Sequence, residues 1–150
     1  ETCPAAAAVV QDVSGRLAAR QGAALFVDYG YDAPRFGSSL QAVKAHRKVD
    51  PFADPGEADL TAHVDFAALA EIAQAAGARW LGTVPQGAWL AAMGIEARAE
   101  ALGRAAPQRR EEIHAAKERL TGDAQMGVLF NVMGLAHPGW PDGAGFPLRG

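Results

Sequence analysis

Two short stretches of this sequence gather side chains that can do chemistry. In the first, Asp28, Tyr29 and Gly30 directly follow the apolar run 23–27. The second is the segment 57–65, which reads EADLTAHVD. Carboxylates, phenols and imidazoles hold polar substrates and exchange protons with them, so both stretches are candidates for a binding or catalytic site. The candidates in the second stretch are three acids, a hydroxyl and an imidazole: Glu57, Asp59, Thr61, His63 and Asp65.

The apolar run 23–27 predicts where the first stretch lies in the fold. Its residues are apolar without alternation, which is typical of a strand buried on both faces of a parallel sheet. In such sheets the carboxyl ends of the strands open onto the ligand crevice, so we expect Asp28 and Tyr29 there. The alternative is a structural role for both residues: Asp28 would only accept hydrogen bonds from loop amides, and the Tyr29 ring would only pack against its neighbours.

Part of the second stretch also has a structural interpretation. Asp65 comes just before an apolar helical pattern that begins at Phe66, so it is a good helix N-cap residue. Asp59 and Thr61 are of the residue types that form side-chain turns. His63 would either order a loop through hydrogen bonds or contact a substrate.

Two other kinds of site fit these residues less well. Asp59, His63 and Asp65 form a D-x₃-H-x-D spacing, but a metal site of oxygens and imidazole needs further ligands that no nearby residue clearly supplies. Ser38 and Ser39 lack the G-x-S-x-G turn of a serine hydrolase. We therefore expect neither a bound metal nor a serine nucleophile.

Composition narrows the classes of partner. The chain has 150 residues, a size typical of one domain, and its net charge of −3 argues against a general nucleic-acid binder. No apolar stretch reaches the length of a membrane span, and the single cysteine, Cys3, excludes an internal disulfide. We expect neither nucleic acid nor a membrane among the partners.

The spacing of apolar residues, glycines and prolines predicts an α/β fold. A helical pattern precedes the first strand, and others cover 65–76, 87–93, 95–105 and 108–120, while 79–84 and 127–135 are two further apolar strands. Three strands alone leave sheet edges unpaired. That indicates a sheet with more strands than these, and it is also compatible with a homodimer.

Four segments resemble a known family. They are DYGY at 28–31, LQAVKAHRKVDPFADPGEADLTAHVDF at 40–66, TVPQGAWLAAMGIEARAEAL at 83–102 and QMGVLFNVMGL at 125–135. In this order they are similar to the C-terminal half of the MidA-type methyltransferases, the family of the mitochondrial complex I assembly arginine methyltransferase. The resemblance covers nearly the whole chain.

The resemblance implies a class I S-adenosylmethionine-dependent fold, which is a doubly wound, Rossmann-like sheet whose seventh strand runs antiparallel beside the fifth. Residues 23–28 would be the fifth strand, 79–84 the sixth and 128–135 the seventh, with a helical insertion at about 87–120 between the last two. The family's glycine-rich cofactor loop has no counterpart, because no G-x-G-x-x-G occurs here. We therefore expect residues 1–150 to be the C-terminal portion of one methyltransferase domain, without the half that binds most of the cofactor and inactive alone.

The resemblance further implies S-adenosylmethionine-dependent methylation of a protein arginine. A guanidinium is planar and cationic, and carboxylates match it well. On this basis we expect Asp28, Tyr29 and His63 to act in catalysis, in a cytoplasmic protein of bacterial type. The alternative is a non-catalytic assembly module that holds a partner protein. The residues expected to bind the substrate are Glu57, Asp59, Thr61 and Asp65.

Overall fold

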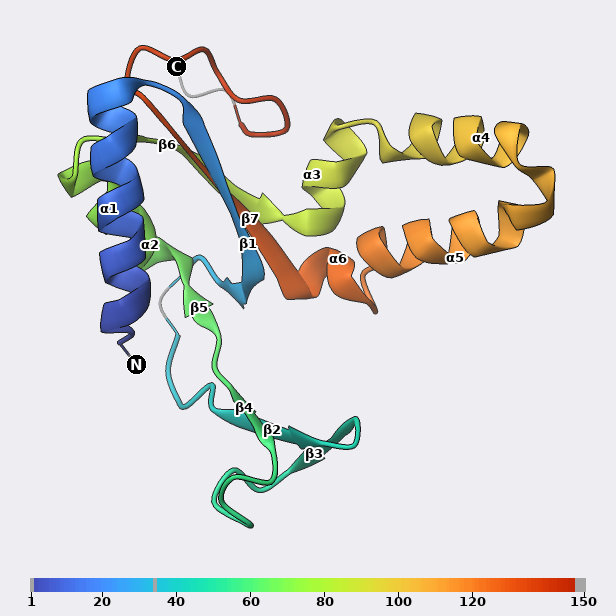
Figure 1. Cartoon of the computed structure of the whole chain (residues 1–150), viewed down its shortest axis with the longest axis horizontal. Helices are drawn as coiled ribbons and strands as arrows, with labels where there is room; N and C mark the ends of the chain where they lie inside the picture. The colour runs from blue at the N-terminus through green and yellow to red at the C-terminus, as the bar shows by residue number, and fades with distance from the viewer. Residues whose placement is uncertain (1, 34, 148–150) are drawn as a thin grey trace.

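A computed structural model describes residues 2–33 and 35–147 of the chain. Three parts are visible in Figure 1: a twisted sheet with two helices against it, a small second sheet, and a helical hairpin that projects from the body. The candidate site residues lie on the two sheets, so these matter most for function.

The main sheet has four strands in the order β5-β1-β7-β6. They are β1 (Ala23–Tyr31), β5 (Val64–Asp65), β6 (Arg79–Pro85) and β7 (Phe130–Ala136). β7 runs antiparallel to both β1 and β6, whereas β5 is parallel to β1. The expected mixed α/β sheet, with its last strand antiparallel beside the first of the predicted strands, is confirmed.

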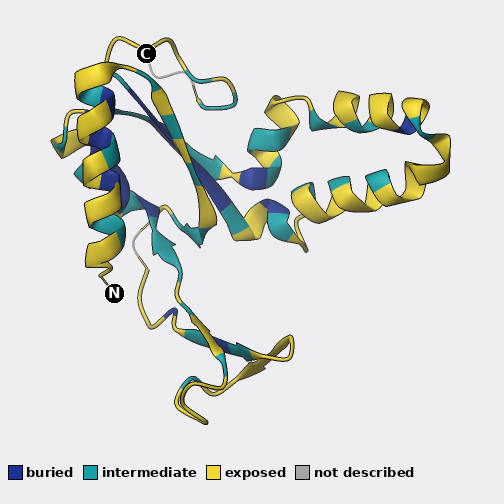
Figure 2. Ribbon diagram, in the orientation of Figure 1, coloured by how far each residue is buried: buried dark blue, intermediate teal, exposed yellow. Residues whose placement is uncertain are grey.

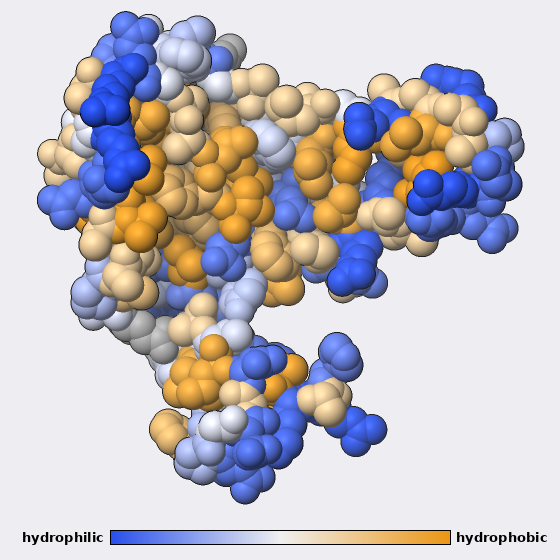
Figure 3. Space-filling model, in the orientation of Figure 1, coloured by the Kyte–Doolittle hydropathy of each residue, from blue (hydrophilic) through white to orange (hydrophobic). Residues whose placement is uncertain are grey.

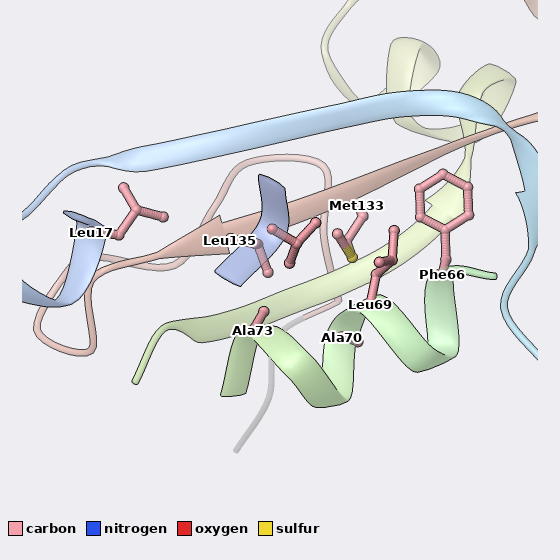
Figure 4. Packing of buried hydrophobic residues seen from close by; sticks show 8 residues of the cluster. Leu17, Phe66, Leu69, Ala70, Ala73, Met133 and Leu135 are labelled. Atoms are coloured by element: carbon pink, nitrogen blue, oxygen red, sulfur yellow. The ribbon is translucent and has the colours of Figure 1, made fainter. Parts of the chain in front are cut away.

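The hydrophobic core lies between this sheet and the helices α1 (Pro4–Arg20) and α2 (Phe66–Ala75), both on one face. α1 begins with Pro4, whose fixed φ suits the first turn. The sheet contributes alternate residues of β7, as the side-chain period of a strand requires. Figure 4 shows seven labelled members of this core: Leu17, Phe66, Leu69, Ala70, Ala73, Met133 and Leu135.

The prediction that 23–28 is buried on both faces is wrong for the described residues. Ala24 and Phe26 pack toward the core, but Leu25 and Val27 on the other face are 50% and 49% exposed. Figure 2 shows this exposure along β1, and Figure 3 shows apolar surface over the same region. The apolar sequence of β1 suits a strand that is covered on both faces, whereas the described helices cover only one face.

A second feature of the fold is the segment between β1 and α2. It contains the strands β2 (Gln41–Lys44), β3 (Arg47–Val49) and β4 (Asp59–Thr61), which form a separate antiparallel sheet in the order β3-β2-β4. Ala42 is its buried centre, at 1% exposed. In Figure 1 this sheet lies well apart from the helical hairpin.

The helical insertion follows the predicted bounds closely. It consists of α3 (Gln86–Ala92), α4 (Ile95–Ala105), the short 3₁₀ turn η1 (Pro107–Arg109) and α5 (Arg110–Thr121). α4 and α5 form the projecting hairpin (Figure 1). Lys117 Nζ donates to the Glu96 carboxylate at 2.9 Å, which joins the two helices and raises the pKa of Lys117. None of the described helices is long and apolar enough to cross a bilayer.

The strand predicted at 127–135 begins later than expected, because Met126–Leu129 form the helical turn α6. Gly127 explains the turn. Its N–H donates to Gly122 O at 3.1 Å, and a Cβ at this position would lie 2.1 Å from Thr121 O. The chain therefore doubles back tightly after α5 before it can extend as β7.

Gly30 is the glycine on which the main sheet depends, and its replacement is the first test. A Cβ at Gly30 would lie 2.1 Å from Val64 O, so Gly30→Ala forces β1 and β5 apart. We expect a loss of about 2 kcal/mol in the free energy of unfolding, measured by urea denaturation.

The matched control is Gly15→Ala in α1, where no atom lies within 4 Å of the added Cβ. Alanine favours a helix interior over glycine by roughly 0.5–1 kcal/mol, so this variant should be more stable. Equal effects of the two substitutions would contradict the close approach of β1 and β5.

Candidate functional site

The structure brings Tyr29 of β1 and His63, the residue just before β5, into contact. Their ring centroids lie 5.8 Å apart with the planes at 77°. Phe130 of β7 meets the other side of Tyr29 at 5.6 Å and 85°. Edge-to-face contacts of this kind are favourable between aromatic rings, so Tyr29 is held from two sides.

Hydrogen bonds fix the His63 imidazole at both ring nitrogens. Arg35 Nη1 lies 3.1 Å from Nδ1, and the Gln41 side-chain amide lies 3.1 Å from Nε2. A guanidinium can only donate, so Nδ1 accepts and the neutral ring carries its proton on Nε2. The Nε2–H of His63 donates a hydrogen bond to Gln41 when the Gln41 amide oxygen faces the ring. The His63 backbone N–H also donates to Ser39 Oγ at 2.9 Å.

Asp28 lies on the opposite face of β1 from Tyr29, because neighbouring side chains of a strand alternate. It is exposed, and its Oδ1 accepts the backbone N–H of Tyr29 at 2.8 Å. The strand continues to Tyr31, so Asp28 is inside β1 and not at its end. The carboxylate remains accessible to a ligand from the face of α1 and α2.

Asn131 of β7 belongs to the same site, and the sequence analysis missed it. It lies directly opposite Asp28 in the antiparallel register, is 8% exposed, and donates from Nδ2 to Gly30 O at 2.9 Å. This bond fixes the backbone between Tyr29 and Tyr31. The signal in the sequence that could have indicated Asn131 is its position as the one amide side chain in the apolar segment FNVMGL.

The remaining predicted residues do not gather around Tyr29. Asp65 caps α2, where its Oδ1 accepts the N–H of Ala68 at 3.0 Å, as the helix pattern predicted. Thr61 lies opposite Gln41 in the small sheet. Asp59 lies farther along the same strand.

Glu57 lies in the bend just before the small sheet's strand β4, away from Tyr29. It forms an exposed ion pair with Lys44, at 3.5 Å. The described ranges contain no cluster of three or more His, Cys, Asp or Glu side chains that could hold a metal ion.

A cavity of about 390 Å³ opens beside His63, between the first turn of α1 and the start of α2. Most of its lining is apolar, and its polar members include Thr2, Tyr31, His63 and Asp65. Pockets of this size that combine apolar walls with a few polar groups are typical of ligand sites. The cavity is at the same end of the sheet as Tyr29 and His63, because α1 begins where β1 ends.

These features define a class of protein. A mixed sheet whose last strand is antiparallel between two others, with polar side chains near the end of the first, is the arrangement expected of S-adenosylmethionine-dependent methyltransferases. The chain belongs to a family of this class: the family described as "Putative S-adenosyl-L-methionine-dependent methyltransferase" matches residues 1–84. The MidA-type assignment is confirmed by the relatives below.

Relatives and solved structures agree with this family. The chain is 36% identical over 137 residues to protein arginine methyltransferase NDUFAF7, mitochondrial, of Mus musculus, covering 90% of this chain and 31% of the relative. The Drosophila melanogaster homolog is 41% identical over 119 residues, covering 76% of this chain and 26% of the relative. A Burkholderia thailandensis protein solved with S-adenosyl-homocysteine superposes with a TM-score of 0.79 at 34% identity, over 91% of this chain and 36% of that one.

Two consequences follow from these comparisons. The chain spans about a third of the length of the curated relatives it matches. The prediction of a cytoplasmic, bacterial-type location is wrong, since the curated relatives from mouse, fruit fly and human are named as mitochondrial proteins.

Asp65→Ala tests whether this acid is a helix cap, as the structure shows. Loss of the bond to the Ala68 N–H should lower the free energy of unfolding by about 1 kcal/mol, and Asp65→Asn should keep most of it. Chemical denaturation measures both. Equal stability of the alanine variant and the unsubstituted protein would show that the cap contributes nothing.

Proposed function

We propose that the whole protein transfers a methyl group from S-adenosylmethionine to an arginine side chain of a protein substrate. The observation that carries this proposal is the contact between Tyr29 and His63 near the end of β1, in a chain of this methyltransferase family. Support for arginine comes from the mouse and fruit-fly relatives, both named protein arginine methyltransferases.

Methyl transfer is a displacement in line with the bond that breaks, so it depends on positioning more than on strong acids or bases. A guanidinium is flat and permanently charged, stacks on aromatic rings and presents paired N–H groups to carboxylates. We assign Tyr29 as the aromatic wall beside the guanidinium. Asp28, on the opposite face of β1, is assigned as a carboxylate that holds another polar group of the substrate. The accessible position of Asp28 supports this assignment.

His63 would act in this mechanism by holding Tyr29 and the loop before β2. Its Nδ1 is the ring nitrogen with a free electron pair and it already accepts from Arg35, so His63 could take a substrate proton only after losing that bond. We propose that Glu57, Asp59 and Thr61 bind the substrate outside the reacting group. Asp65 would contribute through the placement of α2.

The described residues do not form a cradle for the cofactor. The chain has no G-x-G-x-x-G, and the cavity beside His63 offers mainly apolar walls to a ligand that carries a carboxylate, an ammonium and ribose hydroxyls. We propose that residues 1–150 supply the C-terminal, substrate-facing portion of one methyltransferase domain and are inactive alone.

A groove of about 430 Å³ between α4 and α5 favours a second candidate function, a protein-binding or assembly module. It is lined largely by apolar side chains, and Met93 and Leu102 are 49% and 43% exposed. A helix of a partner protein could lie in such a groove. This function needs no cofactor, and the experiments below distinguish it from methyl transfer.

The substitution Asp28→Asn in the full-length protein tests the methyltransferase role. It keeps the shape of the side chain and removes the charge with which Asp28 would hold the substrate, so the rate of methyl transfer should fall about 100-fold while the thermal unfolding temperature stays unchanged. The control is Asp123→Asn, an exposed acid in the turn after α5, which should leave the rate unchanged. An unaltered rate for Asp28→Asn would make this acid structural only.

Calorimetry with S-adenosylmethionine tests whether the cofactor site lies outside residues 1–150. We expect no heat of binding for residues 1–150 alone and clear binding for the full-length protein. Binding to the isolated residues would contradict the assignment of the cofactor site elsewhere. No binding to either would favour the assembly module.

A further inference from the structure

The small sheet has two outer strands of opposite charge. In the order β3-β2-β4, the strand β3 carries Arg47 and Lys48, whereas the strand β4 carries Asp59 and no base. Glu57, just before β4, is already paired with Lys44 of β2. In the part of the chain that the structure describes, no strand pairs with the outer edge of β4. This edge is therefore acidic and open to another strand.

Strand alternation defines the backbone groups on this edge. β4 pairs with β2 along its inner edge, and beyond β4 the His63 N–H donates to Ser39 Oγ on the same side. The N–H and C=O of one residue in an antiparallel strand share a side, and successive residues alternate. Leu60 and Ala62 therefore direct their N–H and C=O groups away from β2. Leu60 is also 60% exposed.

β4 leads directly into the candidate site. Only Ala62 and His63 separate β4 from β5, and the His63 ring is the one that contacts Tyr29. An extended chain advances about 3.3 Å per residue, so a strand laid along β4 reaches this ring pair within a few residues.

We propose that the open edge of β4 binds the protein substrate as an added strand. The bound segment is extended and cationic, with its target arginine beside His63, so this inference rests on the function proposed above. Main-chain hydrogen bonds to Leu60 and Ala62 supply affinity, and the Asp59 carboxylate selects positive charge.

Amide hydrogen exchange on the full-length protein tests the edge directly. The probe is the acetylated and amidated peptide Thr-Val-Arg-Val-Thr, and its control carries citrulline, an uncharged arginine analogue. We expect exchange at the Leu60 and Ala62 amides to slow about tenfold when the arginine peptide is at about ten times its dissociation constant, and to slow less with citrulline.

Three results of this experiment would overturn the inference. One is unchanged exchange at both amides, and another is slowing on β3 in place of β4. The third is slowing that rises with protein concentration without any peptide, because a second copy of the chain would then occupy the edge.

Two substitutions separate the charge from the backbone contribution. Asp59→Lys reverses the charge of the edge, and Leu60→Pro removes an N–H that points away from β2, a place where an edge strand tolerates proline. For methylation of the same peptide, each should raise KM about tenfold and lower kcat by less. Lys48→Glu on β3 is the matched control and should leave KM unchanged.

The two proposals fail separately in these experiments. If KM stays the same in both β4 variants, the edge does not bind the substrate, although the enzyme methylates arginine. If the full-length protein methylates no arginine but the peptide protects Leu60 and Ala62, the methyltransferase proposal fails and the edge still binds cationic extended segments.

Discussion

The close contact between the backbones of β1 and β5 holds the candidate site together. Gly30 pairs with Val64 in parallel, at a distance that leaves no space for a side chain on Gly30. Tyr29 and His63 each come one residue before this pair, so the same register places their rings side by side. Asn131 adds a bond from β7 to the Gly30 carbonyl, and three strands are thereby fixed at one point.

This arrangement separates the rigid part of the site from its accessible part. Tyr29 lies between two rings, and His63 is bonded at both nitrogens and at its backbone. Asp28 and the residues of β4 face solvent instead. Under the proposed function, the firmly held ring of Tyr29 and the accessible carboxylates are the parts that a flat, charged side chain arriving from outside would meet.

The sequence predicted the elements whose signals are local. The apolar run identified β1, the position of Asp65 before Phe66 predicted the helix cap, and glycines and prolines bounded the insertion to within a residue or two. The order of the strands came from the family resemblance, because periodicity alone says nothing about which strands pair.

The remaining features depend on residues that are distant along the chain. The bond from Asn131 to the Gly30 carbonyl spans 101 positions, and no local pattern indicates it. Residues 127–129 look like part of a strand until the fold requires the chain to turn at Thr121. The exposure of Leu25 and Val27 depends on which helices lie over the sheet. The apolar sequence of one strand predicts that it is buried but does not show which element covers it.

The projecting hairpin has a consequence for how the molecule unfolds. No residue of α5 is buried, and the link between Lys117 and Glu96 is a surface ion pair, which adds little stability in water. Local opening requires less free energy where few apolar contacts are lost. The arm made by α4 and α5 should therefore melt and re-form many times while the main sheet stays folded, and proteases should cut it more readily than that sheet.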